Sequence, residues 1–284
     1  MPHPSNATTD QGDGLSVLGI DAAWTAHHPS GIALVRHTAE GWRCELLAPS
    51  YDAFINQASD HECDPARKAK GSRPDPAALL RASRQRIGSC IDCIAVDMPL
   101  AMTAITSRRA ADTAIASRYG SRGCAVHSPS AQRPGAIADR LRAELETLGY
   151  RLQTAASPHP EAALIEVYPH VALLTLLNLS YRLPYKVSRS AQYWKAEQLS
   201  ISQRIERLLS HFQEIRSGLD AQITGIPPFI PRASQVSTLA SLKPIEDMLD
   251  ALICAWVGIE HLEGRTLGLG DHNAAIWVPA AGAR

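Results

Sequence analysis

The sequence predicts a mixed α/β fold, in which a three-stranded antiparallel meander is continued by parallel strands and covered by helices on both faces. Two observations lead to this prediction. Three short β-rich runs, joined by short polar loops, occupy residues 16–48. A predicted helix then separates them from another apolar run at 91–97, and a strand–helix–strand order implies parallel pairing. The 284-residue chain is 45% hydrophobic, which is ordinary for a globular protein with a sizeable core.

The predicted strands are short and rich in apolar and β-branched residues. We expect them over 16–24, 31–36, 42–48, 91–97, 162–167 and 274–278. The fourth ends before Pro99 and the fifth before Pro169, because proline cannot continue a β ladder.

Helices are predicted where apolar residues recur at helical spacing. We expect them over 51–59, 76–87, 107–119, 136–148, 170–177, 190–219 and 239–262. The last has the clearest period, since Leu249, Leu252, Trp256 and Ile259 share one side. A meander, a helical crossover, a fourth strand and later helices follow the order of the ribonuclease H-like fold, in which strand one lies centrally beside strand four.

The chain is expected to form one ribonuclease H-like domain over residues 15–279 with helical insertions. A disordered polar tail at 1–14 and a short tail at 280–284 flank it. We find no secretory signal and no run of about 18 apolar residues, so we expect a cytoplasmic protein that does not contact membranes. Lys plus Arg and Asp plus Glu both number 28, which argues against binding nucleic acid through net positive charge but allows a local basic face.

Acidic residues occur in apolar settings near the ends of predicted strands. Asp21 lies in the first strand, Asp97 ends the fourth, and Glu166 is near the end of the fifth. Asp247 and Asp250 are three residues apart on the last helix and project on one side. A carboxylate buried among Ile, Val and Ala is costly unless it is paired or metal-bound. Because ligand sites in open α/β sheets lie at the carboxyl ends of strands, we expect these acids to converge.

Several converging acids without a matching set of cations indicate hard divalent ions such as Mg²⁺ or Mn²⁺. Two such ions about 4 Å apart can activate a water and stabilise the leaving oxygen in phosphodiester hydrolysis. The hypothesis is therefore a metal-dependent nuclease or other phosphodiesterase, a hydrolase with two ions. Asp21, Asp97 and Asp250 are its expected metal ligands, and Asp247 and Glu166 are auxiliary catalytic residues.

Each acid also has a structural explanation. Asp21 could accept backbone N–H groups, and Asp97 could cap the turn at Pro99. Glu166 could pair with an arginine such as Arg108 or Arg109, and Asp247 could pair with the lysine four residues before it.

Basic residues follow the strand that Asp97 ends, so they should lie on the same side of the sheet. Arg108, Arg109 and Arg118 are the expected phosphate contacts, because guanidinium groups match phosphate oxygens bidentately. His127, in the next loop, is a candidate general base or acid. A second basic group is equally well explained as a solvated surface. It comprises Arg67, Lys68, Lys70, Arg73, Arg81, Arg84 and Arg86.

The segments GIDAAW, AVDMPL, EVYPH, DMLDALICAW and AAIWVP, in this order over residues 16–279, resemble the domain of unknown function 429 family. That family is described as predicted nucleases with a ribonuclease H-like fold. The pattern also resembles Holliday-junction resolvases, in which acids on strands one and four meet a helix with an i, i+3 acid pair before an alanine. Asp21, Asp97, Asp247 and Asp250 occupy the matching positions. The resemblance implies a metal-dependent nuclease-like site, with nucleic acid or another phosphodiester as partner.

Two other function classes remain open. A sugar-kinase or actin-like phosphotransferase also begins with a Gly-Ile-Asp strand, but here Ala22 follows the aspartate in place of the usual glycine, and no second copy of the domain appears. A non-catalytic binding module that kept the fold is the other alternative, and failure to bind Mn²⁺ with the acids intact would favour it.

Overall fold

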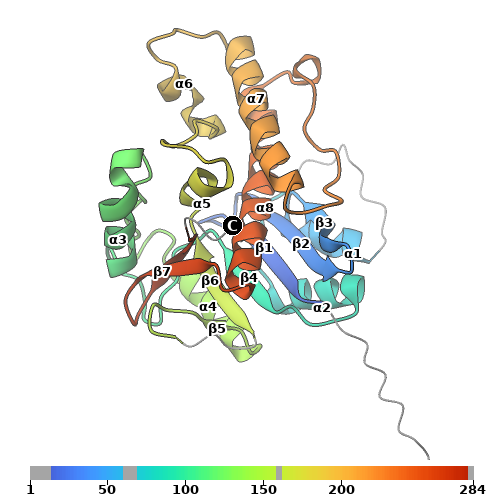
Figure 1. Ribbon diagram of the computed structural model, residues 1–284, viewed down its shortest axis with the longest axis vertical. Helices are drawn as coiled ribbons and strands as arrows, with labels where there is room; N and C mark the ends of the chain where they lie inside the picture. Colours follow the sequence, from blue (N-terminus) through green and yellow to red (C-terminus); the bar gives the residue numbers. More distant parts are fainter. Residues whose placement is uncertain (1–13, 60–68, 158–161, 281–284) are drawn as a thin grey trace, which may run out of the picture.

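The structure, a computed structural model, describes residues 14–59, 69–157 and 162–280 (Figure 1). Within these ranges an eight-stranded mixed sheet has the order β3-β2-β1-β4-β6-β8-β7, with β5 beside β6. The strands are β1 (Ser16–Asp21), β2 (Gly31–Thr38), β3 (Gly41–Ala48), β4 (Cys93–Val96), β5 (Arg151–Leu152), β6 (Ala163–Val167), β7 (Thr266–Gly270) and β8 (Ala275–Pro279). The predicted mixed α/β fold is confirmed.

The strand pairing brings the carboxyl ends of β1, β4 and β6 to one edge of the sheet. β1 pairs antiparallel with β2 and parallel with β4, and β4 pairs parallel with β6. The first strand therefore lies centrally beside the fourth, as predicted. Asp21 is the last residue of β1, and Asp97, directly after β4, donates its backbone N–H to the carbonyl of Ile20 at 2.9 Å. These two acids thus end neighbouring parallel strands.

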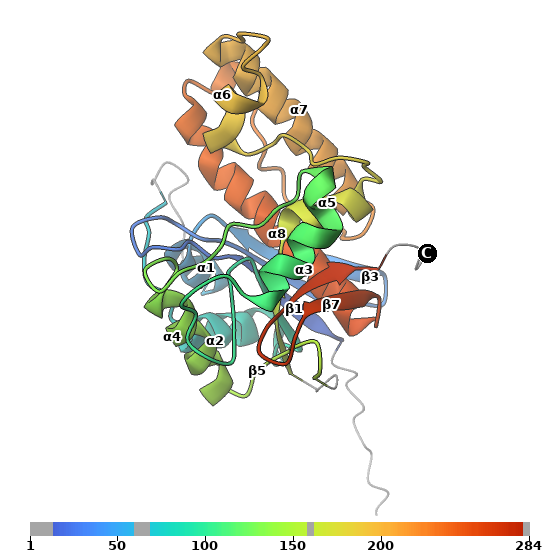
Figure 2. The same ribbon diagram turned by 90° about the vertical axis from the view of Figure 1, so that its left-hand side faces the viewer.

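Helices cover both faces of the sheet (Figure 2). The helices are α1 (Tyr51–Ala58), α2 (Pro76–Ile87), α3 (Ala110–Tyr119), α4 (Ala136–Thr147), α5 (Pro169–Leu176), α6 (Ser190–Tyr193), α7 (Ile201–Asp220) and α8 (Lys243–Leu262). Alternate residues of β1 point to opposite faces. Leu18 and Ile20 pack with α1, α2 and α4, whereas Val17 packs with α5, α7 and α8. In Figures 1 and 2, α6 and α7 extend away from the sheet.

Several predicted elements differ from the observed ones. The helix predicted over 190–219 is two helices, because Ser200 and Gln203 form a capping box that begins α7. The last helix starts at Lys243, after a 3₁₀ turn over Leu239–Leu242. The strands β5 and β7 were not predicted, because two residues are too few for a pattern and β7 is a glycine-containing edge strand.

Some sequence predictions fall beyond the described residues. These are nearly all of the tails at 1–14 and 280–284, together with Arg67 and Lys68 of the second basic group. Among the described helices, none is long and apolar enough to cross a membrane.

The backbone of α8 lies directly on the backbones of β1 and β2 because glycines occupy the contact points. A Cβ atom at Gly19 would lie 2.2 Å from the carbonyl oxygen of Ala251, and one at Gly31 would lie 2.0 Å from that of Asp247. Both carbonyls belong to the helix that carries the predicted acid pair. The missing side chains therefore let α8 bring Asp247 and Asp250 to the end of β1.

We expect Gly19→Ala to destabilise the protein, because the added methyl group meets helix backbone, which cannot move aside as a side chain can. The free energy of unfolding, measured with urea, should fall by at least about 2 kcal/mol. Gly120→Ala is the matched control, since Gly120 is in a right-handed helical conformation with open space around its Cβ position. Equal stability of the two variants would contradict this account of the α8 contact.

Candidate functional site

Four of the five predicted acids converge where β1 and β4 end beneath α8. Burial raises the pKa of Asp21 well above its usual value, and the negative charges of Asp250 and Asp247 raise it further. The pKa of Asp247 is likewise raised, chiefly by burial. Burial raises the pKa of Asp97 to about 7, with Asp250 and Glu166 adding to the increase. The acids therefore converge as predicted, and burial together with their mutual repulsion disfavours the ionised carboxylates.

Two lysines neutralise the acids of α8. Lys186 forms an ion pair with Asp250 and lies 3.6 Å from Glu246 Oε1. Lys243 Nζ lies 2.7 Å from Glu246 Oε1 and also pairs with Asp247, four residues along the helix. The expectation that the acids have no matching cations is therefore wrong for the helix side of the cluster. The alternative partner for Asp247 that the sequence left open, the lysine four residues before it, is the one observed.

Asp250 is fully buried and has both carboxylate oxygens engaged. Tyr185 Oη donates to Oδ1 at 2.5 Å, and Lys186 Nζ donates to Oδ2. The neighbouring Glu246 accepts the backbone N–H of Val187 at 2.6 Å. These two acids of α8 thus hold the segment around Lys186 in place, and full burial makes Asp250 the least accessible of the converging acids to a metal ion.

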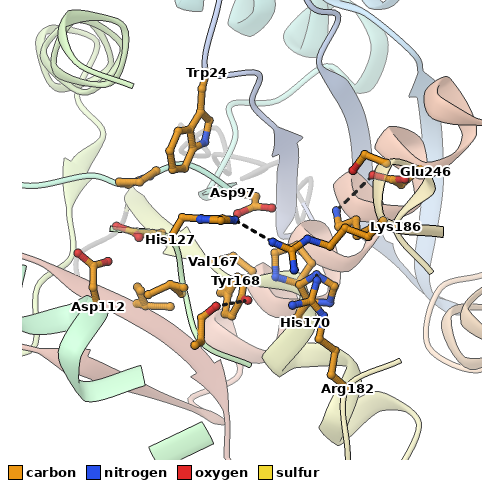
Figure 3. Close-up of a pocket in the computed structure, with 18 of the residues that line it drawn as sticks. Trp24, Asp97, Asp112, His127, Val167, Tyr168, His170, Arg182, Lys186 and Glu246 are labelled. Atoms are coloured by element: carbon orange, nitrogen blue, oxygen red, sulfur yellow. Dashed lines mark hydrogen bonds and ion pairs between the residues drawn. The ribbon is translucent and has the colours of Figure 1, made fainter. Parts of the chain in front are cut away.

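Asp97 lines two cavities, and Figure 3 shows the first of them. The first cavity has a volume of about 340 Å³ and the second about 490 Å³. Both are lined by Trp24, Asp97, His127 and Lys243. No hydrogen bond or ion pair joins the Asp97 carboxylate to any described residue, so it does not cap the turn at Pro99. It is an unpartnered acid that faces the cleft.

The described residues do not form a ready metal site. No group of three or more His, Cys, Asp or Glu side chains within the described ranges is arranged to hold an ion. The donor chemistry nevertheless suits a hard cation, because Asp21, Asp97 and Asp247 line the second cavity together and offer carboxylate oxygens. Adding positive charge there would relieve the repulsion that raises their pKa values.

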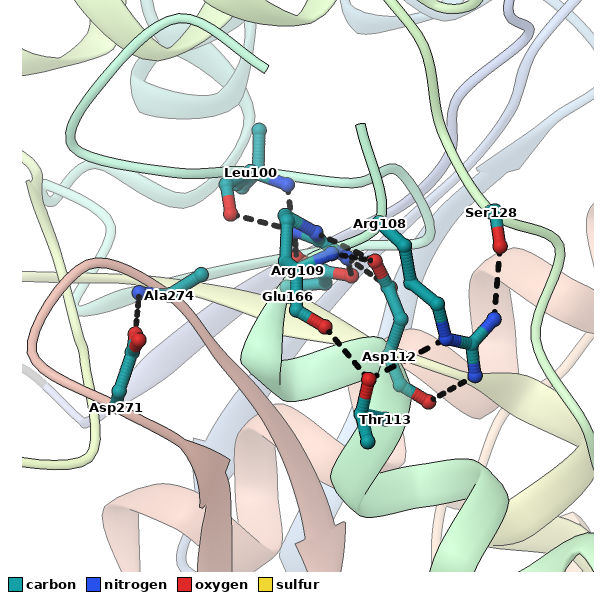
Figure 4. A network of polar contacts seen from close by, with 9 residues as sticks. All are labelled: Leu100, Arg108, Arg109, Asp112, Thr113, Ser128, Glu166, Asp271 and Ala274. Atoms are coloured by element: carbon teal, nitrogen blue, oxygen red, sulfur yellow. Dashed lines mark hydrogen bonds and ion pairs between the residues drawn. The ribbon is translucent and has the colours of Figure 1, made fainter. Parts of the chain in front are cut away.

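Glu166 belongs to a separate buried network (Figure 4). Arg109 binds it bidentately, at 2.6 and 2.7 Å, and also binds Asp112 and the carbonyl oxygen of Leu100. The arginine pairing that the sequence left open for Glu166 is therefore the one observed. Arg109 is only 8% exposed, and all three of its guanidinium nitrogens are engaged. No donor remains for phosphate, which corrects its assignment as a substrate-binding residue.

The other predicted substrate contacts lie in different places. Arg108 binds Ser128 Oγ at 2.8 Å on the exposed side of α3, and neither it nor Arg118 lines the two cavities. His127 lines both cavities, and its Nε2 lies 3.3 Å from an Arg189 nitrogen. Of the four predicted substrate residues, Arg109 and His127 therefore line the first cavity, and of these two only His127 is available to a ligand.

The sequence-based reasoning missed the segment that forms the far wall of the first cavity. Arg182, Lys186 and Arg189 line this wall, and Glu246 fixes its position through Val187. The segment is irregular until residue 187, so it has no hydrophobic period. The only signal is the spacing of its three basic residues, which by itself is typical of a solvated surface.

We expect Arg109→Met to lower the free energy of unfolding by about 3–5 kcal/mol, because it leaves Glu166 and Asp112 buried without their cation. Arg207→Met, which removes an exposed ion pair with Glu197, should cost within about 1 kcal/mol. Urea unfolding of both variants measures the difference. A small effect at Arg109 would show that the network is not a structural support.

The raised pKa of Asp97 has a predictable effect on stability. The folded state holds a proton there up to about pH 7, whereas the usual pKa is 3.8, so this residue makes the protein less stable as pH rises between those values. In the presence of EDTA, Asp97→Asn should therefore unfold with a free energy higher by on the order of 1–3 kcal/mol at pH 8, and by much less at pH 4. Glu206→Gln, on the exposed face of α7, is the control. Urea unfolding at both pH values tests the sign, and destabilisation of Asp97→Asn at pH 8 would contradict it.

Comparison with known proteins identifies the family of this chain. No curated protein and no solved structure matches the chain. A family model described as "protein of unknown function (DUF429)" matches residues 19–275, a range that contains the end of β1, all of β4, β6 and α8, and every residue of the acid cluster. The chain therefore belongs to the DUF429 family.

Proposed function

We propose that this protein is a divalent-metal-dependent phosphodiesterase, a hydrolase whose active site is the pair of cavities beside Asp97. The observation that carries the proposal is the unpartnered carboxylate of Asp97, beside Asp21 at the ends of two parallel strands. A carboxylate in an electrostatically unfavourable position and open to a cleft is a feature of functional sites. The proposed location of this enzyme is the cytoplasm, as the sequence predicts.

The sheet supports a ribonuclease H-like assignment within this proposal. The order β3-β2-β1-β4-β6 consists of a three-stranded meander followed by parallel strands. The helix α8 crosses β1 and carries Asp247 and Asp250 to its end. This arrangement matches the order of acids that the sequence predicted for a nuclease-like site.

Asp21, Asp97 and Asp247 are the residues that would hold Mg²⁺ or Mn²⁺. The ion would supply Lewis-acid stabilisation of a phosphoryl oxygen. Because Asp250 is fully buried and already accepts hydrogen bonds from Tyr185 and Lys186, the carboxylates that line the second cavity support one ion better than the two that the sequence predicted. His127, at the edge of both cavities, is placed to give a proton to a leaving oxygen. The substrate is nucleic acid or another phosphodiester.

A non-catalytic binding module is the second candidate, and one observation favours it. Lys186 and Lys243 neutralise the α8 acids without any metal ion, so that part of the cluster is stable in a protein that binds no cation. Such a module would retain the cleft and its basic wall but would not hydrolyse a ligand.

We expect Mn²⁺-dependent hydrolysis of bis(p-nitrophenyl) phosphate or of an oligonucleotide by the EDTA-stripped, reloaded protein. Single- and double-stranded DNA, RNA and branched substrates should be compared. Asp97→Asn and Asp21→Asn should each lower the rate at least 100-fold, because each removes one ligand of the ion. Glu206→Gln, an exposed acid far from the cleft, should retain it.

Calorimetric titration of Mn²⁺ separates the two candidates. A phosphodiesterase should bind Mn²⁺ with an affinity that Asp97→Asn weakens. If the folded wild-type protein binds no Mn²⁺, the binding module is favoured, and if the aspartate variants cleave at the wild-type rate, the proposed site is wrong.

A further inference from the structure

The wall of the first cavity that faces Asp97 is basic. Arg182, Lys186 and Arg189 line it, and His170 lies beside them at the start of α5. In Figure 3, Lys186 lies across the cavity from His127, with His170 and Arg182 below them. All three cations lower the pKa of the His170 imidazole, which burial already lowers. Three positively charged side chains therefore lie close to the uncharged imidazole ring of His170.

Arg182 and Arg189 differ from the other cations of this cavity in having no carboxylate partner among the described residues. Arg182 Nη2 lies 2.6 Å from His170 Nε2 and 3.3 Å from Tyr193 Oη, and its Nη1 is 3.5 Å from a backbone carbonyl. Arg189 Nη2 lies 3.3 Å from His127 Nε2. None of these partners is a carboxylate, so two guanidinium charges beside the cavity are uncompensated.

The remaining cations of the cavity are all neutralised. Lys186 and Lys243 pair with acids of α8, and Arg109 pairs with Glu166 and Asp112. The excess positive charge of the wall is thus located at Arg182 and Arg189. An anionic ligand in the first cavity would compensate it.

Two of the residues that line this cavity also carry unused hydrogen-bond donors. His170 is 5% exposed, and because its Nε2 faces the guanidinium group of Arg182, its Nδ1 carries the proton. This Nδ1 and the Nε of Arg182 are buried with no hydrogen-bond partner in the described ranges. Tyr168, which precedes α5, and Pro169 and His170, which begin it, also line the cavity, and a helix N-terminus favours an anion.

We propose that Arg182, Arg189 and His170 form a subsite for a terminal phosphate group of the substrate. This inference rests on the proposed function and specifies its substrate class. A terminal phosphate carries a charge of about −1.5 to −2 at neutral pH, which matches two unpaired guanidinium groups, whereas an internal diester carries one charge. The phosphorylated end occupies the first cavity, the scissile bond lies beside Asp97, and the rest of the substrate enters the second cavity.

Binding in EDTA tests the subsite without requiring hydrolysis. The probes are two thymidine dinucleotides that differ only in a 5′-phosphate, together with inorganic phosphate, and calorimetry gives the dissociation constants. The phosphorylated dinucleotide should bind at least tenfold more tightly than the unphosphorylated one. Arg189→Gln and Arg182→Gln should each abolish most of this preference, Arg189→Lys should retain part of it, and Arg84→Gln, an exposed change on α2, should leave it intact.

The outcomes distinguish this inference from the proposed function. Equal affinity for the two dinucleotides, or an unchanged preference in the Arg189 and Arg182 variants, would overturn the subsite. Binding of inorganic phosphate as tightly as the phosphorylated dinucleotide would overturn its assignment to a substrate terminus. Because Arg182→Gln also removes contacts to His170 and Tyr193, the more peripheral Arg189→Gln is the decisive variant. A phosphate preference in a protein without Mn²⁺-dependent hydrolysis would support the subsite and reject only the phosphodiesterase.

Discussion

The backbone contact between α8 and the central strands β1 and β2 is the constraint on which the rest of the site depends. Glycines at positions 19 and 31 allow this contact, because any side chain there would overlap with carbonyl oxygens of the helix. The helix consequently lies closer to the sheet than side chains would permit. Its acids reach the carboxyl end of β1, where Asp21 and Asp97 end parallel strands. Tight packing and a dense concentration of negative charge are thus two results of one contact.

The protein compensates this negative charge in two ways. On the helix side, Lys186 and Lys243 pair with Glu246, Asp247 and Asp250. At the next strand, Arg109 uses its whole guanidinium group on Glu166, Asp112 and a carbonyl. Asp97 is left without either kind of partner. Charge compensation therefore separates the acids that support the structure from Asp97 and Asp21, which line the cavities without a cation partner in the described ranges.

As a consequence, one side of the cleft is negatively charged and the opposite side is positively charged. Carboxylates lie at the strand ends, and uncompensated arginines lie on the opposite wall of the first cavity. The zero net charge of the chain conceals this separation, because opposite charges are gathered on facing surfaces. Such an arrangement favours a ligand with a localised negative end over a long polyanion, since only the wall and not the whole surface is positive.

The sequence alone determined the mixed α/β fold, the central place of β1 beside β4, and the acids that meet at their ends. These features follow from local patterns, since apolar runs, prolines after strands and helical spacing act over a few residues. Only the tertiary structure decided which charges are paired. Arg182 and Lys186 come from an irregular segment and Arg189 from a short 3₁₀ turn, and none of them has a periodic signal. Glu166 pairs with Arg109, which is buried beside it, and not with the exposed Arg108. Pairing depends on distances between residues far apart in the chain, and a hydrophobic pattern contains no information about those distances.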